Sequence, residues 1–228
     1  MTDNRSRPPE ALLAALSRDL RPVRPLAPPS WQAVRMLPLA LLITAGVFLV
    51  IGLRRDTAVL GPLLAWGASL AQLILGVVLV WIAARESTPG HRLPRNIVLM
   101  ALGAAVLIVV AITLWTFHAR PIVIPSRFSP WRAGLMCGMN STIAGIFLLV
   151  GVALLLGRRS LAERPALVGA LFGAGAGIVV NASWRLSCPV SSPSHSLLAH
   201  GSPVIIATLA GAILVSTMAR YAWRRRSD

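Results

Sequence analysis

The chain has no lysine, only seven acidic residues and only two cysteines among its 228 residues. Charged residues make up 13% of it, whereas soluble domains carry about 25%. Hydrophobic residues make up 56%, and the mean hydropathy is +0.73. A chain with so little charge is not an ordinary soluble domain, and this composition indicates a membrane protein.

Six apolar stretches, separated by short loops that carry arginine, fill most of the chain. A bilayer-spanning helix needs about 20 mostly apolar residues, because backbone groups in lipid must be paired within the segment. The predicted spans are residues 36–53, 60–84, 96–117, 133–157, 165–186 and 201–220. The sequence therefore predicts an all-α integral membrane protein. Its bundle of six transmembrane helices covers 36–220, between a tail over 1–35 and a basic C-terminus over 221–228.

The arginines are distributed unevenly between the two sides that this topology defines. An even number of spans places both termini on one side, and 16 of the 22 arginines fall on that side. The positive-inside rule therefore predicts that both termini are cytoplasmic. This rule also accounts for the net charge of +15. Because no soluble binding module accompanies the charge, we expect no direct nucleic-acid partner.

The predicted cytoplasmic tail has two parts. Residues 10–20 place four leucines at helical spacing on one face, Leu12, Leu13, Leu16 and Leu20. The next stretch, RPVRPLAPPS over 21–30, contains four prolines and is predicted to be extended. A helix of about ten residues is marginal alone in water. Physical reasoning leaves two interpretations of the leucine face: it lies on the membrane surface, or it binds a cytosolic partner.

Within the spans, small residues recur at helical spacing and ionisable residues are rare. Gly169, Gly173 and Gly177 repeat every four residues in the fifth span, and Gly134 and Gly138 do so in the fourth. Such spacing predicts close packing of helices. No carboxylate, histidine or arginine lies near the middle of a predicted span. This pattern disfavours a small-molecule transporter, which usually carries such a group there.

The two cysteines, Cys137 and Cys188, fall at the outer ends of consecutive spans, on the predicted periplasmic side. His195 and His200 lie in the outer loop 187–200, and His118 begins the other long outer loop. One interpretation is two buried small residues beside solvated histidines. The other is a thiol pair that senses an oxidant or a soft metal ion. The spacing contains no CxxC or HxxxH motif.

Two stretches resemble a known family. The tail reads DLRPVRPLAPPSWQAV over 19–34, and the distal part reads RPALVGALFGAGAGIVVNASWRLSCP over 164–189. Both are similar to the NrsF-like family of integral membrane anti-sigma factors, which are negative regulators of extracytoplasmic-function sigma factors. The resemblance covers nearly the whole chain. It implies a bacterial inner-membrane protein with a cytoplasmic N-terminal segment that holds the sigma factor.

The resemblance also implies roles for particular residues. Combined with the leucine face and two arginines, the sigma-binding set is Leu12, Leu13, Leu16, Asp19, Leu20, Arg21, Pro22, Val23, Arg24 and Leu26. Cys137 and Cys188 are the implied periplasmic sensor thiols, which respond to metal or oxidative stress. They are also candidate metal ligands together with His200. Where the family carries a histidine before the second cysteine, this chain has Ser187.

We therefore predict a membrane-bound anti-sigma factor that is not an enzyme and uses no cofactor. Its expected partners are an extracytoplasmic-function sigma factor and the lipid bilayer. The alternative is a membrane thiol-redox protein in which the cysteine pair is catalytic. A single thiol pair disfavours that alternative, because quinone-linked oxidation normally passes electrons through a second pair.

Overall fold

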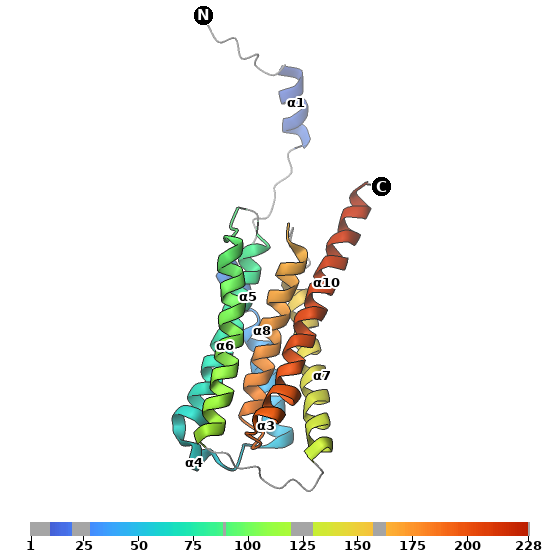
Figure 1. Ribbon diagram of the computed structural model, residues 1–228. Helices are drawn as coiled ribbons and strands as arrows, with labels where there is room; N and C mark the ends of the chain where they lie inside the picture. Colours follow the sequence, from blue (N-terminus) through green and yellow to red (C-terminus); the bar gives the residue numbers. More distant parts are fainter. Residues whose placement is uncertain (1–9, 20–27, 89, 120–129, 157–162, 228) are drawn as a thin grey trace, which may run out of the picture.

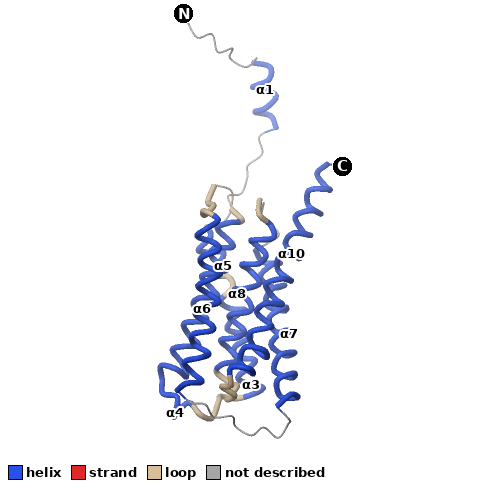
Figure 2. The backbone as a smooth tube through the Cα atoms, in the orientation of Figure 1, coloured by secondary structure: helices blue, strands red, loops and turns tan. Residues whose placement is uncertain are grey.

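The computed structural model describes residues 10–19, 28–88, 90–119, 130–156 and 163–227, and every regular element in these ranges is helical (Figures 1 and 2). The tail helix α1 (Glu10–Asp19) stands apart from the bundle. The first membrane-length run joins α2 (Pro29–Val34) to α3 (Leu37–Ile51). The second joins α4 (Thr57–Pro62), the π-helical turn η1 (Leu63–Gly67) and α5 (Ala68–Glu86).

The remaining four runs complete the bundle. α6 (Arg95–Ala119), α7 (Pro130–Leu156) and α8 (Pro165–Arg185) are single helices. The last run joins α9 (Pro193–His195), the π-helical turn η3 (Ser196–Gly201) and α10 (Ser202–Ser227). In the part of the chain that is described, six runs are long and apolar enough to cross a membrane. The predicted all-helical class is confirmed, and so is the prediction of six apolar helices of membrane-spanning length.

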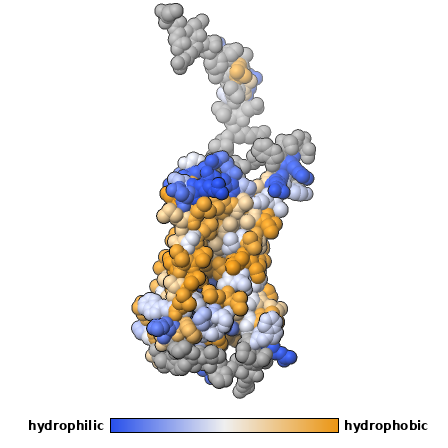
Figure 3. Space-filling model, in the orientation of Figure 1, coloured by the Kyte–Doolittle hydropathy of each residue, from blue (hydrophilic) through white to orange (hydrophobic). Residues whose placement is uncertain are grey.

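The face of the bundle seen in Figure 3 is apolar between two more polar ends. Large side chains from four different helices are exposed, with Leu49 on α3 at 88%, Met100 on α6 at 70%, Phe147 on α7 at 65% and Ile213 on α10 at 65%. Exposed apolar area of this extent is abnormal for a soluble monomer. It is the surface expected of a bundle that contacts lipid.

Helix α8 lies at the centre of the bundle. Of its membrane-length window, 83% is buried, against 17–44% in the other five runs. It contacts α3, α5, α7 and α10. Its Leu171 and Phe172 are fully buried, as are Leu79 of α5 and Leu148 of α7. Any displacement of α8 would therefore be transmitted to most of the bundle.

Glycines let two helices approach α8 closely. On one side, a Cβ built on Gly173 would lie 2.0 Å from the Ala207 carbonyl oxygen of α10, and one on Gly169 would lie 2.1 Å from the Gly211 oxygen. On another side, a Cβ on Gly175 would lie 2.7 Å from the Gly76 oxygen of α5. These distances leave no room for a side chain. The predicted packing role of the fifth-span glycines is confirmed.

Polar side chains inside the bundle bond across helices. Asn181 Nδ2 of α8 donates to Gln72 Oε1 of α5 at 3.3 Å. The hydroxyls of Thr44 on α3 and Ser183 on α8 are 2.8 Å apart. Gln72, Asn181 and Ser183 are buried. These bonds add directional contacts where apolar packing between helices is otherwise non-specific.

Two sequence predictions were wrong in their boundaries. The proline-rich stretch was predicted to be extended through Ser30, but α2 begins at Pro29, because proline suits the first turn of a helix. Residues 187–200 were predicted to be a loop before a span that begins at 201. Instead, helix begins at Pro193 and continues through η3 into α10. Both histidines of this stretch are therefore on helical backbone.

The two ends of the bundle differ in what they hold. α1 and the C-terminal end of α10 lie at the same end (Figure 1). The beginning of α7, the end of α8 and the α9–η3 segment lie at the other end, beside α4. An even number of spans requires that α1 and the end of α10 share one end of the bundle. The meeting of α7, α8 and the α9–η3 segment at the other end brings the cysteines and histidines together.

Candidate thiol and imidazole site

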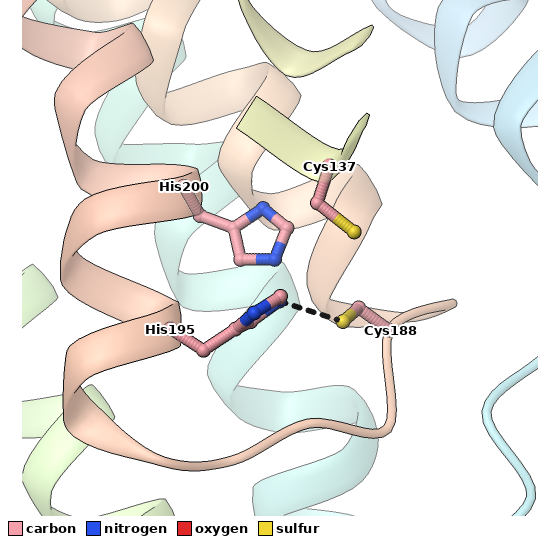
Figure 4. A group of neighbouring side chains, drawn as sticks. All are labelled: Cys137, Cys188, His195 and His200. Atoms are coloured by element: carbon pink, nitrogen blue, oxygen red, sulfur yellow. Dashed lines mark hydrogen bonds between the residues drawn. The ribbon is translucent and has the colours of Figure 1, made fainter. Parts of the chain in front are cut away.

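Four side chains meet at the end of the bundle that lies opposite α1 (Figure 4). Cys137 comes from α7, Cys188 follows α8, His195 ends α9 and His200 lies in η3. One ligand atom from each lies within 4.8 Å of the others. Cys188 Sγ is 3.4 Å from His195 Nε2. The ring centroids of His195 and His200 are 5.0 Å apart in an edge-to-face arrangement.

The structure adds one residue, His195, to the metal set predicted from the sequence. In an α-helix, residues five apart point about 140° away from each other. In a π-helical turn the backbone bonds run from i to i+5, so residues five apart lie about one turn apart on one face. The η3 turn therefore brings His195 and His200 together. A pair of histidines soon after the second cysteine was the only sequence signal for this arrangement.

Cys137 reaches this group because α7 passes close to the α9–η3 segment. A Cβ on Gly138 would lie 3.5 Å from the Ala199 carbonyl oxygen, and one on Gly134 would lie 3.9 Å from His195 Nδ1. These are ordinary van der Waals distances. The fourth-span glycines thus lie on a packing face, as predicted, but either position has room for a Cβ, unlike the fifth-span glycines. The segment that packs on this face carries the histidines.

His200 is the most enclosed of the imidazoles. Only 6% of its surface is exposed. Its Nδ1 lies 3.4 Å from the Ser141 hydroxyl of α7. Its Nε2 is buried and has no hydrogen-bond partner among the described residues, and it points towards the two sulfur atoms (Figure 4). The ring of Trp184 lies 6.1 Å away, centroid to centroid.

The environment of Cys188 favours its thiol form. Its hydrogen bond with Cys137 and its burial both raise the pKa of the Cys188 thiol, whereas the neighbouring His195 and His200 act in the opposite direction. Its backbone N–H donates to the Trp184 carbonyl at 2.7 Å, which fixes it to the last turn of α8. Both cysteines are free thiols in the structure.

A buried ion pair supports the segment that carries Cys188. Arg54 and Asp56, in the connection between α3 and α4, are 4% and 8% exposed. The Arg54 guanidinium donates two bonds to the Asp56 carboxylate, at 2.6 and 2.8 Å. It also donates to the Arg185 carbonyl and the Ser191 hydroxyl, each at 3.2 Å. Arg54 thereby connects the end of α3 to residues on both sides of Cys188.

A small cavity lies between this ion pair and the thiol site. Arg54, Arg185, Cys188, Ser191 and His200 are among its lining residues. The Arg185 guanidinium donates to the Leu64 carbonyl at 3.1 Å and to the Thr116 hydroxyl at 2.9 Å. The cavity is therefore a small space with polar and charged side chains in its lining, beside Cys188 and His200.

The structure describes only some of the predicted sigma-binding residues, whereas it describes all four residues of the thiol and imidazole site. Leu12, Leu13, Leu16 and Asp19 lie in α1, which confirms the predicted tail helix, and the Leu12 side chain is 50% exposed. The predicted contacts Leu20, Arg21, Pro22, Val23, Arg24 and Leu26 lie outside the described residues. His118 lies in the last turn of α6 and is not part of the four-residue group.

Comparison with known proteins places this architecture in a family. A family model described as negative regulator of sigma F matches residues 16–221, which is nearly the whole chain. No curated protein and no solved structure matches the chain. The resemblance found from the tail and the distal motif is therefore confirmed. The chain belongs to the family of negative regulators of sigma F, and its partner is accordingly a sigma factor.

Proposed function

We propose that this protein is an inner-membrane anti-sigma factor that holds an extracytoplasmic-function sigma factor on its cytoplasmic tail and releases it on a periplasmic signal at the thiol site. The family assignment supports negative regulation of a sigma factor. The observation that carries the proposal is the separation of two features. The apolar face of α1 lies at one end of the bundle and the thiol and imidazole site at the other.

The arginine distribution supports the orientation. Arg220 and Arg224 in α10 lie at the end that also holds α1, and the side bearing the termini has 16 of the 22 arginines. Under the positive-inside rule this end faces the cytoplasm. The thiols would then face the periplasm, where oxidised cysteine persists. Sequestration at the membrane would keep the sigma factor from RNA polymerase without any catalysis.

The leucine face of α1 supports partner binding over a purely structural role. Leu12 is half exposed, and α1 stands apart from the bundle (Figure 1). A short helix of this kind is stabilised when its apolar face is covered. A groove on a sigma factor would cover it in the way that amphipathic helices are commonly bound.

Replacing Leu16 by glutamate should abolish capture of the sigma factor. Burying one leucine contributes about 1.5–3 kcal/mol, so its loss alone should weaken binding about 10- to 100-fold. The test is co-purification of the full-length protein with each co-expressed extracytoplasmic-function sigma factor. Ala14→Glu, which adds the same charge on the opposite side of α1, should retain the partner. Equal retention by both variants would contradict the tail assignment.

A second variant separates holding from sensing. Replacing both cysteines by serine should leave repression intact and remove induction, because the tail is unchanged and the thiols are gone. A reporter for sigma-dependent transcription measures both states. Ser194→Ala, at an exposed position of the same segment, should respond normally. Normal induction in the double variant would reject the thiol signal. Rapid thiol exchange with a quinone would instead favour the thiol-redox alternative.

A further inference from the structure

We propose that the cavity between Arg54 and Arg185 is a binding site for a small, singly charged anion of the halide type, and that this anion neutralises Arg185. The cavity lies at the end of the bundle opposite α1. Neither a metal ion nor thiol oxidation takes part in the binding, which does not depend on the proposed function. The proposal stands on the charge balance at this end, on an unpartnered nitrogen of Arg185, and on the lining and size of the cavity.

Positive charge is in excess at this end of the bundle. Of the seven acidic residues in the chain, only Asp56 falls in a connection at this end. Both oxygens of its carboxylate accept bonds from Arg54, at 2.6 and 2.8 Å. Arg54 also donates to the carbonyl of Arg185 at 3.2 Å, and both guanidiniums line the same cavity. One carboxylate therefore serves two neighbouring guanidiniums, which leaves one positive charge in excess.

The hydrogen bonds of the Arg185 side chain go to neutral oxygens. Its Nη2 donates to the Leu64 carbonyl at 3.1 Å and to the Thr116 hydroxyl at 2.9 Å. Its Nε is buried and has no hydrogen-bond partner among the described residues. A buried donor without an acceptor is costly, more so on a charged group, and buried charges in proteins are normally paired. An anion that accepts from Nε–H would supply both the missing bond and the missing charge.

The lining of the cavity suits an anion and not a cation. It contains two guanidiniums, four hydroxyls and an amide, but no carboxylate. The Ser191 hydroxyl accepts from Arg54 Nη2 at 3.2 Å, so its own hydrogen can donate to an anion. Guanidinium and hydroxyl donors from separate parts of the chain thus surround one small space.

The size of the cavity selects the kind of anion. Its volume is about 20 Å³, and one water-sized particle needs about 10–15 Å³. A monatomic anion such as chloride is close to this size, whereas sulfate and phosphate carry four oxygens around a central atom and are larger. A single negative charge also matches the excess of one arginine. Size and charge together therefore favour a halide.

An anion in this position would act as a structural ligand. It would join Arg54, in the connection between α3 and α4, to Arg185 at the end of α8. Because both arginines adjoin the segment that carries Cys188, the anion would hold that segment in the folded state. A ligand that binds only the folded state raises its apparent stability in proportion to the occupancy of the site.

The test uses the purified full-length protein in detergent, in sodium chloride or in sodium gluconate at equal ionic strength. We expect a higher unfolding temperature in chloride, which rises with chloride concentration because the anion binds the folded state. Line broadening of the chloride NMR signal measures binding directly. Bromide should displace the bound chloride, whereas sulfate should not. Both effects should persist when Cys137 and Cys188 are replaced by serine.

Three substitutions locate the site. Arg185→Gln removes the excess charge and should abolish both the stabilisation by chloride and the line broadening. Arg55→Gln removes an exposed arginine at the same end and should leave both effects unchanged. Ser191→Asp supplies a carboxylate from the chain itself. It should unfold in gluconate at about the temperature that the wild type reaches in chloride, and it should gain nothing from added chloride.

Four results would overturn the proposal. Equal unfolding temperatures in the two salts, without line broadening, would show that no anion binds. An equal loss of both effects in Arg55→Gln would show general charge screening and no defined site. Displacement of chloride by sulfate would overturn the halide assignment. If Arg185→Gln does not fold, Ser191→Asp still decides, because continued chloride binding by that variant would place the anion elsewhere. All of these measurements are made without the sigma factor, so they leave the proposed function standing.

Discussion

Replacing Arg54 by alanine is expected to lower the free energy of unfolding by about 3–5 kcal/mol, because it leaves the Asp56 carboxylate buried without its main countercharge. The pair is bidentate, with bonds of 2.6 and 2.8 Å, and both residues are under 10% exposed. The same change removes the bonds to the Arg185 carbonyl and the Ser191 hydroxyl. Thermal unfolding in detergent measures the loss.

Two further variants make the Arg54 prediction specific. Arg55→Ala removes an exposed neighbouring arginine and should leave the unfolding temperature nearly unchanged. Replacing both Arg54 and Asp56 by leucine should recover much of the loss, because a buried ion pair can often be exchanged for apolar packing at little cost. If Arg54→Ala were as stable as Arg55→Ala, the buried pair would not hold this end of the bundle together.

Replacing Gly173 by leucine is expected to separate α8 from α10. Even a Cβ at this position would lie 2.0 Å from the Ala207 carbonyl oxygen and 2.7 Å from the Thr208 Cα. These are backbone atoms, so no rotamer change relieves the clash and the helices must move apart. Inserting extra atoms into a well-packed core typically costs about 1–3 kcal/mol, occasionally more. Because α8 contacts four other helices, we expect an effect at the upper end of this range.

Gly103 offers a matched control for this substitution. It lies in α6, is exposed, and a Cβ there would meet no atom within 4 Å. Gly103→Leu should therefore unfold at nearly the wild-type temperature, while Gly173→Leu unfolds at a clearly lower one. Gly173→Ala should fall between them. Equal unfolding temperatures for the two leucine variants would show that α8 and α10 are not held at this distance in solution.

Much of the fold could be predicted from local patterns. The six spans follow from apolar length, because a helix in lipid satisfies its backbone within one segment and needs no knowledge of its neighbours. The fifth-span glycines were predicted as a packing face, and the structure shows them against α10. Their spacing alone could not show that Gly175 faces a second partner, α5, and that α8 is therefore central.

The candidate site could be predicted only in part. Topology put Cys137, Cys188 and His200 at one membrane face, and the family resemblance implied their roles. His195 was left out of the predicted metal set, and both histidines were assigned to a loop, whereas the π-helical turn η3 brings them together. Arg54 was counted as one charge among the outer-side arginines. Its burial with Asp56 depends on the approach of residues 185–191, which are distant in sequence.

The sequence by itself determined that the chain forms six helices long and apolar enough to cross a membrane, together with an amphipathic tail helix, and its motifs indicated the family. These properties depend on composition, on the helical spacing of apolar residues and on short motifs along the chain. The tertiary structure alone decided that α8 is the central helix, that two histidines join the two thiols, and that a buried ion pair supports the Cys188 segment. Each of these depends on contacts between residues far apart in sequence, whose distances no local pattern encodes.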